Sequence, residues 1–229
     1  MIFETGRELL DAVRTRPTGS ITTLRVGVAD VMAKLVTFQL LLPATHADEP
    51  VRLVCREDHP RQLFAALAVH DLDLLLADVP LSPGLDVKAC SHVLGESTAS
   101  WFAAPQLAKT LRRGFPASLN GAPFLMPTRD TAMRGTLESW FDAHSIRPVV
   151  AGEFDDSALL KVFGQEGVGV FPAPTAVADR VCSQYRVRVL GELERTREVF
   201  YAISPERRVK HPAVTRIIEH AKARLFSSS

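Results

Sequence analysis

The segment DLDLLLAD, residues 71–78, decides the fold class of this chain. Its residues 74–77 are four consecutive apolar side chains, followed by an aspartate. Strands buried on both faces of a parallel sheet carry continuous apolar runs, whereas half-exposed strands alternate apolar and polar residues. The segment therefore predicts a central strand of a parallel sheet in an α/β protein.

The residues before this strand supply its partners. Residues 24–30, LRVGVAD, predict a strand with a polar corner, and residues 31–45, VMAKLVTFQLLLPAT, predict a helix that we expect to stop at Pro43. Residues 51–57 predict another strand and residues 60–71 another helix. With the central strand, these segments complete a β-α-β-α-β unit.

The second half of the chain repeats this alternation. We expect a strand over residues 87–94, then strands over residues 123–127, 148–154, 168–174, 185–190 and 198–204, with helices over residues 131–144, 157–165, 175–181 and 211–226. Ligands of open parallel sheets bind beyond the carboxyl ends of the strands. Two α/β units therefore predict two lobes around a cleft, at which the corners near Asp30, Ser97, Thr128 and Asp155 converge.

The composition narrows the classes of function. The chain has 229 residues, a hydrophobic content of 46% and a formal net charge of +1. This length suffices for one large domain or two small ones. A domain that binds nucleic acid by itself has a basic excess, and these residues have none.

Motifs for catalysis and for metal binding are missing from the sequence. Cys55, Cys90 and Cys182 form no CxxC pair, and the chain contains neither an HExxH nor a GxSxG motif. We therefore expect no enzymatic activity. The start, MIFETGRELLDAV, lacks a signal-peptide pattern, and no segment has the roughly 18 apolar residues of a membrane span, so we expect a cytoplasmic protein without a membrane partner.

Three carboxylates crowd one expected strand-to-helix corner. Glu153, Asp155 and Asp156 precede the helix predicted over residues 157–165. A short acidic side chain at this point caps a helix, because it accepts hydrogen bonds from free backbone N–H groups. Three hard oxygen donors also suit a small cation such as Na⁺. Both interpretations stay open, and they differ in whether the chain senses an ion.

Asp30 has the same two interpretations. It ends the strand over residues 24–30, so it either caps the next helix or faces the cleft. An ion held between Asp30 and Asp155 would draw the two lobes together. Glycines in GQEGVGVFP, residues 164–172, follow a helix and precede a strand, which is the reverse of a dinucleotide loop, and we interpret Gly164 as a helix C-cap.

Other polar side chains lie near the expected cleft. Ser97, Thr98 and Ser100 in GESTAS offer hydroxyls to a ligand, or they are polar residues of a hinge. Arg129 could pair with an anionic effector, or it is a surface arginine. The helix over residues 31–42 is apolar nearly all round, so we expect either deep burial or a second subunit on its free side.

The chain resembles a known family. VGVADVMAKLV, LLLADVP, VVAGEFDDSALLKVFG, VFPAPTA and HPAVTRI, in the order in which they occur, are similar to segments of the effector-binding region of LysR-type transcriptional regulators. They look most like the NhaR branch, whose members activate sodium/proton antiporter genes. The resemblance covers essentially the whole chain.

This resemblance implies a type 2 periplasmic-binding-protein-like fold. Two Rossmann-like lobes would be joined by crossover strands near residues 101–105 and 198–202, with the effector between the lobes. Lobe I would comprise residues 20–102 and 200–229, and lobe II residues 103–199.

Matching positions supply the implied effector site. They are Asp30, Val31, Ser97, Thr98, Ser100, Thr128, Arg129, Asp155, Asp156 and Phe171. The acidic corner adds a candidate Na⁺ or Li⁺ site, for which we expect Asp30, Glu153, Asp155 and Asp156 as ligands. The implied function is a sodium-responsive activator without a catalytic step or a resident cofactor. The alternatives are a sensor of a small organic anion, or a solute-binding protein of the same fold.

The family also implies partners. LysR-type proteins begin with a winged helix-turn-helix and a linker helix. Residues 1–19 resemble only the tail of that linker, so we expect a truncated form of a longer regulator. The regulator would form a homodimer or a tetramer, bind DNA through the missing domain, and contact RNA polymerase.

Overall fold

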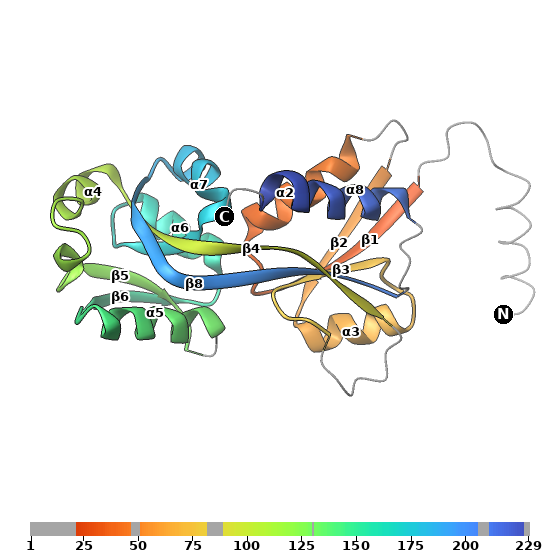
Figure 1. Cartoon of the computed structure of the whole chain (residues 1–229), viewed down its shortest axis with the longest axis horizontal. Helices are drawn as coiled ribbons and strands as arrows, with labels where there is room; N and C mark the ends of the chain where they lie inside the picture. Colours follow the sequence, from red (N-terminus) through yellow and green to blue (C-terminus); the bar gives the residue numbers. More distant parts are fainter. Residues whose placement is uncertain (1–21, 47–50, 82–88, 130, 206–210, 227–229) are drawn as a thin grey trace, which may run out of the picture.

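The computed structural model describes residues 22–46, 51–81, 89–129, 131–205 and 211–226. Within these ranges the chain forms two α/β lobes, and two long strands run from one lobe into the other (Figure 1). The predicted fold class is therefore confirmed. The linker expected over residues 1–19 lies outside the described residues. None of the described helices is long and apolar enough to cross a membrane.

Lobe I is built on the strand that the sequence singled out. Strand β3 (Leu74–Ala77) is buried at all four positions and pairs parallel to β1 (Thr22–Ala29), which pairs parallel to β2 (Val51–Asp58). Helices α2 (Lys34–Thr45) and α8 (Pro212–His220) lie together on one side of this sheet, and α3 (Pro60–Ala68) lies on the other (Figure 1). A short π-helical turn, η3 (Ala221–Leu225), follows α8.

The two crossover strands are β4 (Cys90–Ala103) and β8 (Arg188–Ser204). They pair antiparallel along nearly their whole length, from Cys90 opposite Ser204 to Ala103 opposite Arg188. The expected break between strands at residues 185–190 and 198–204 is wrong. Residues 191–193 stay paired with β4, whereas residues 194–197 form an irregularity in the ladder, where the backbone N–H of Ala99 donates to Thr196 Oγ1. The strand continues through this irregularity, and the long two-stranded connection carries the sheet from one lobe to the other.

Lobe II contains the remaining elements. Strands β5 (Pro123–Pro127) and β6 (Val149–Phe154) pair parallel, and β7 (Phe171–Pro174) pairs antiparallel to β4. The helices are α4 (Pro105–Leu111), α5 (Ala132–Ala143), α6 (Ser157–Gln165) and α7 (Ala178–Tyr185), with short 3₁₀ turns η1 (Ala117–Leu119) and η2 (Thr175–Val177). The sequence did not predict α4.

Two expectations about α2 are wrong. The helix begins at Lys34, after the N-cap residue Ala33, so Asp30 does not cap it. Pro43 lies inside the last turn and does not stop the helix at that residue.

The two sides of α2 differ in their packing. Phe38 keeps 46% of its surface exposed, while α8 packs along the buried side of α2. Whether a second subunit covers Phe38 stays a prediction.

Gly164 is not a C-cap. It lies inside α6, whose C-cap is Glu166, and the left-handed glycine beyond the helix is Gly167, with a φ of +81°. A Cβ atom on Gly164 would lie 2.2 Å from a ring carbon of Phe171. The glycine is therefore required by the close approach of β7 to α6.

Candidate functional site

A cavity of about 310 Å³ lies between the lobes. Its walls come from the corners that follow β1, β3, β5 and β6 and from the middle of the crossover strands, as expected for a ligand site at strand ends. The carboxylate, ammonium and guanidinium side chains that line it are those of Asp78, Asp155, Lys161, Arg197 and Glu198. The remaining lining is mostly apolar, and Met133 of α5 and Leu160 of α6 belong to it.

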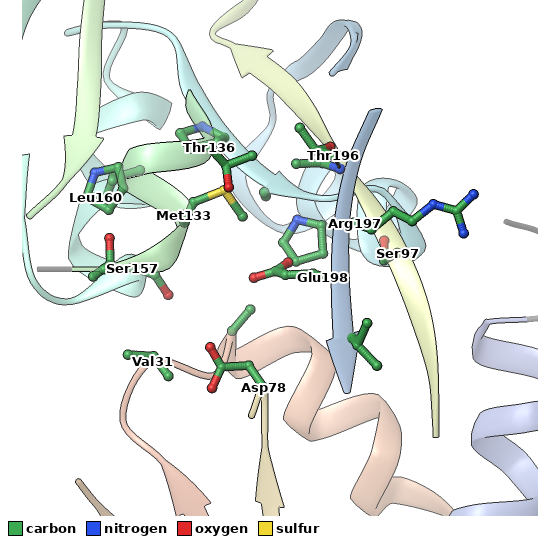
Figure 2. Close-up of a pocket in the computed structure, with 18 of the residues that line it drawn as sticks. Val31, Asp78, Ser97, Met133, Thr136, Ser157, Leu160, Thr196, Arg197 and Glu198 are labelled. Carbon is green, nitrogen blue, oxygen red and sulfur yellow. Dashed lines mark hydrogen bonds between the residues drawn. The ribbon is translucent and has the colours of Figure 1, made fainter. Parts of the chain in front are cut away.

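Two carboxyl groups share this space. Asp78 follows β3, Glu198 lies on β8, and Figure 2 shows both side chains directed into the same part of the pocket. Figure 2 shows that Arg197 points to the other side of β8, as strand alternation requires. Arg197 forms an ion pair with Glu96.

Glu198 is the more perturbed of the two acids. Burial raises its pKa to about 7, the charge of Asp78 adds to this rise, and Lys161 opposes it. Its Oε2 atom is enclosed and has no hydrogen-bond partner among the described residues. Burial also raises the pKa of Asp78, with a smaller contribution from the charge of Asp30. An enclosed carboxylate oxygen without a partner can accept a cation or a donor group of a ligand.

Lys161 contributes the opposite charge from lobe II. The residue is only 4% exposed, and its Nζ donates a hydrogen bond of 2.8 Å to the carbonyl oxygen of Ser157, one turn earlier in α6. Burial lowers its pKa to about 8, although Asp156 and Glu198 act against this shift. The pocket therefore holds acidic groups from lobe I (Asp78), from the crossover strand β8 (Glu198) and from lobe II (Asp155), together with the basic Lys161 of lobe II.

The acidic corner at the start of α6 divides its three carboxylates among different partners. Asp156 caps α6 by accepting a hydrogen bond of 2.6 Å from the backbone N–H of Ala158. Glu153 forms an ion pair of 2.8 Å with the buried Arg134. In the part of the chain that the structure describes, no three His, Cys, Asp or Glu side chains form a group that could hold a metal ion.

Asp155 is the only member of this corner that lines the pocket. Its Oδ1 accepts a hydrogen bond of 3.3 Å from the hydroxyl of Thr128, at the end of β5. The capping interpretation is thus confirmed for Asp156. A sodium ion at this corner stays a prediction, with Asp155 as the residue placed to take part.

The other expected residues fall into two groups. Val31 and Ser97 also line the pocket. The remaining residues are not among its lining: the exposed Asp30 and Arg129, the partly buried Thr98 and Thr128, and the buried Ser100 and Phe171.

The hydroxyls of the crossover instead join the lobes. Ser97 Oγ accepts a hydrogen bond of 3.0 Å from the backbone N–H of Ala176, and Thr175 Oγ1 lies 3.0 Å from Thr98 Oγ1 and 2.8 Å from Ser100 Oγ. These contacts fasten η2 to β4 at the point where β4 passes between the lobes.

Sequence reasoning missed Asp78, Lys161 and Glu198. A signal existed for Asp78, because it directly follows the continuous apolar strand, where ligand-binding side chains gather. Lys161 was also visible as the one charged residue in ALLKVFG. Glu198 had no local signal, since a glutamate at the start of an apolar run is common on exposed strands.

Comparisons with known proteins agree with this architecture. A family model described as the LysR substrate binding domain matches residues 18–226. The transcriptional activator protein NhaR of Escherichia coli (strain K12) is 33% identical over 227 residues, which are 99% of this chain and 74% of that protein.

Regulatory domains are among the solved structures that share this fold. The reduced regulatory domain of OxyR2 from Vibrio vulnificus superposes with a TM-score of 0.61 at 15% identity, covering 93% of this chain and 98% of that one. The effector domain of the regulator AmpR of Pseudomonas aeruginosa gives a TM-score of 0.60 at 22% identity, over 88% and 96% of the two chains. These likenesses show the fold alone.

Proposed function

This chain belongs to the LysR substrate-binding domain family, and from that premise we propose that it is the sodium-sensing domain of a transcriptional activator. The family is non-enzymatic, and LysR-type regulators act as oligomers that bind DNA. The proposed effector is Na⁺ or Li⁺, and the proposed output is control of sodium/proton antiporter genes. The 33% identity to NhaR supports this assignment.

One observation carries the proposal, namely the unpartnered Oε2 atom of Glu198 in a pocket that both lobes line. Asp78 supplies a second carboxyl group from the same side, and Asp155 lies on the opposite wall. Small hard cations take oxygen ligands such as carboxylates and carbonyls. We infer that the ion binds to Glu198 and Asp78, and that Asp155 approaches it when the lobes close.

The affinity that this site needs is modest. A sensor of millimolar sodium requires a dissociation constant near that concentration, or roughly 4 kcal/mol of binding free energy. Burial raises the pKa of Glu198 and of Asp78, so a proton competes with the ion at both groups. The ion changes the regulator only if it prefers one lobe arrangement, because equal affinity for two arrangements shifts neither.

A small organic anion is the second candidate effector, and Lys161 favours it. Its ammonium group is buried in the pocket wall and is the group there best suited to a carboxylate ligand. Arg129, the residue that the sequence suggested for this role, does not line the pocket.

Titration calorimetry distinguishes the two candidates. The protein is titrated with NaCl, LiCl and KCl, with choline chloride keeping the ionic strength constant, and separately with small carboxylates such as acetate and succinate. We expect binding of Na⁺ and Li⁺, a loss of about tenfold in affinity in Glu198→Gln, and tighter cation binding in Lys161→Met, which lacks the competing charge. Glu194→Gln, an exposed acid on the same strand, is the matched control.

Other outcomes of this titration reassign the effector. Binding of a carboxylate that Lys161→Met abolishes, without binding of Na⁺ or Li⁺, would establish the anion sensor. Sodium binding that Glu198→Gln retains in full would remove Glu198 from the site.

Assembly and location complete the proposal. We infer that the exposed Phe38 side of α2 meets a second copy of the chain, and that the regulator is a dimer or a tetramer of cytoplasmic chains. DNA and RNA polymerase would be contacted by the assembled full-length regulator. The oligomeric state of Phe38→Lys, measured by sedimentation, tests the contact.

A further inference from the structure

A second cavity of about 380 Å³ lies at another part of the boundary between the lobes. Its lining comes from α2 and from the α8–η3 segment in lobe I, and from η2 and the start of α7 in lobe II. Neither the family resemblance nor the effector pocket accounts for it, and the two cavities have no lining residue in common.

The charged lining of this second cavity is mainly basic. Arg180 comes from α7, His220 from the end of α8 and Arg224 from η3, and Asp179 is the one acid among them. Basic groups therefore reach one cavity from both lobes. Polar side chains of Gln39 and Thr175 complete the lining that can form hydrogen bonds.

Arg180 contacts an aromatic side chain of lobe I. Its guanidinium carbon lies over the Phe38 ring of α2, 5.9 Å from the ring centroid, which is within reach of a cation–π interaction. No ion pair joins Arg180 to any of the residues that the structure describes. Its hydrogen-bond donors are thus not committed to a carboxylate in this part of the chain.

We propose that this cavity binds a small organic phosphate. Guanidinium groups present paired N–H donors that match the oxygens of a phosphate, and a histidine can add a third donor. The volume falls in the range of small-molecule sites, which begins at about 300 Å³, and it exceeds the size of a lone phosphate ion. Gln39 and Thr175 are suited to the hydroxyl groups of a sugar-like remainder.

Ligand binding in this cavity would also act on the effector pocket. Ala176 lines the second cavity and donates its backbone N–H to Ser97 Oγ, and Ser97 lines the first. Thr175, beside it, is hydrogen-bonded to Thr98 and to Ser100. A phosphate drawn between Arg180 and Arg224 would pull on the same segment, η2, that is fastened to β4 between the lobes.

The test is calorimetric titration with inorganic phosphate, ribose 5-phosphate and ribose, at constant ionic strength because long-range charge effects are screened by salt. We expect ribose 5-phosphate to bind more tightly than inorganic phosphate and ribose not to bind. Arg180→Gln and Arg224→Gln should each weaken binding by about tenfold. Arg147→Gln, an exposed arginine that lines neither cavity, should leave it unchanged.

Two results would overturn the site. One is the absence of binding of both phosphates to the unmodified protein at concentrations on the order of 10 mM. The other is binding that persists in both arginine variants with normal affinity. Thermal unfolding of each variant, compared with Arg147→Gln, ensures that a loss of binding is measured on folded protein. The effector titration is independent of these measurements, so either proposal can fail without the other.

Discussion

Lys161 on α6 and Glu198 on the crossover strand β8 line one pocket, and each opposes the effect of burial on the pKa of the other. Without Lys161, the carboxyl group would hold its proton more tightly. Without Glu198, the ammonium group would lose its proton more readily. Asp78 of lobe I and Lys161 of lobe II both act on the pKa of Glu198. Because lobe motion changes the distance between Asp78 and Lys161, the protonation of the pocket and the arrangement of the lobes are linked.

Glu198 makes stability depend on pH in the mildly acidic range. Its pKa rises from 4.5 to about 7 on folding, so the folded state binds its proton more tightly than the unfolded state. The stabilisation from this proton is complete below pH 4.5 and is lost as the pH rises through about 7. Relative to Glu198→Gln, the protein should lose on the order of 2 kcal/mol across this window. Urea unfolding at a series of pH values measures it.

Glu194→Gln serves as the control for that series, since Glu194 is exposed on the same strand. Its unfolding free energy should follow that of the unmodified protein at every pH. If Glu198→Gln shows the same pH dependence as Glu194→Gln, the carboxyl group of Glu198 titrates normally and our account of the pocket is wrong.

Lys161 is expected to lower the stability of the ligand-free protein. Its pKa falls from 10.5 to about 8 on folding, so its stabilising contribution exists above pH 10.5 and is lost as the pH falls through about 8. Near neutral pH the buried charge therefore costs stability, and Lys161→Met should raise the unfolding free energy by about 1–2 kcal/mol. Thermal and urea unfolding both measure this change. A less stable variant would mean that the hydrogen bond to Ser157 outweighs the burial of the charge.

Alanine variants of Asp155 and Asp156 should differ in their effects on stability and on effector binding. Asp156→Ala removes the cap of α6 and should cost about 1 kcal/mol of unfolding free energy. Asp155→Ala removes a longer contact with Thr128 and should change stability by less than about 0.5 kcal/mol. Because only Asp155 lines the pocket, only its variant should alter the effector titration directly. Equal effects of both variants on effector binding would contradict this division.

The sequence predicted well the elements whose pattern is local. The bounds of α6 are as expected, because a capping aspartate and a run of apolar residues at helical spacing define it. We predicted two strands in place of β8 because residues 191–197 are mostly polar, and the ladder with β4 is in fact irregular at residues 194–197 before pairing resumes at Glu198. We predicted the start of α2 too early because aspartate is a common N-cap residue, whereas Asp30 lies in the turn before the actual N-cap, Ala33.

The functional pocket was harder to predict than the fold. Its position between the lobes followed from the strand ends, and Val31, Ser97 and Asp155, three of the residues expected to bind the effector, lie in its lining. Lys161 and Glu198 become important only through burial and through each other, and they are 37 positions apart by their numbers. Such a pair has no local pattern, so it emerges only when α6 and β8 are brought to the same pocket by the fold.

Gly164 provides a stability test with an internal control. Alanine at this position would place a methyl group 2.2 Å from the Phe171 ring, so Gly164→Ala should force α6 and β7 apart and cost about 1–3 kcal/mol. Gly135 lies in α5 and has nothing within 4 Å of an added Cβ, so Gly135→Ala should instead stabilise the protein by about 0.5–1 kcal/mol. Urea unfolding of the two variants should therefore give changes of opposite sign. Changes of the same sign would show that helix propensity, and not the contact with Phe171, determines the residue at position 164.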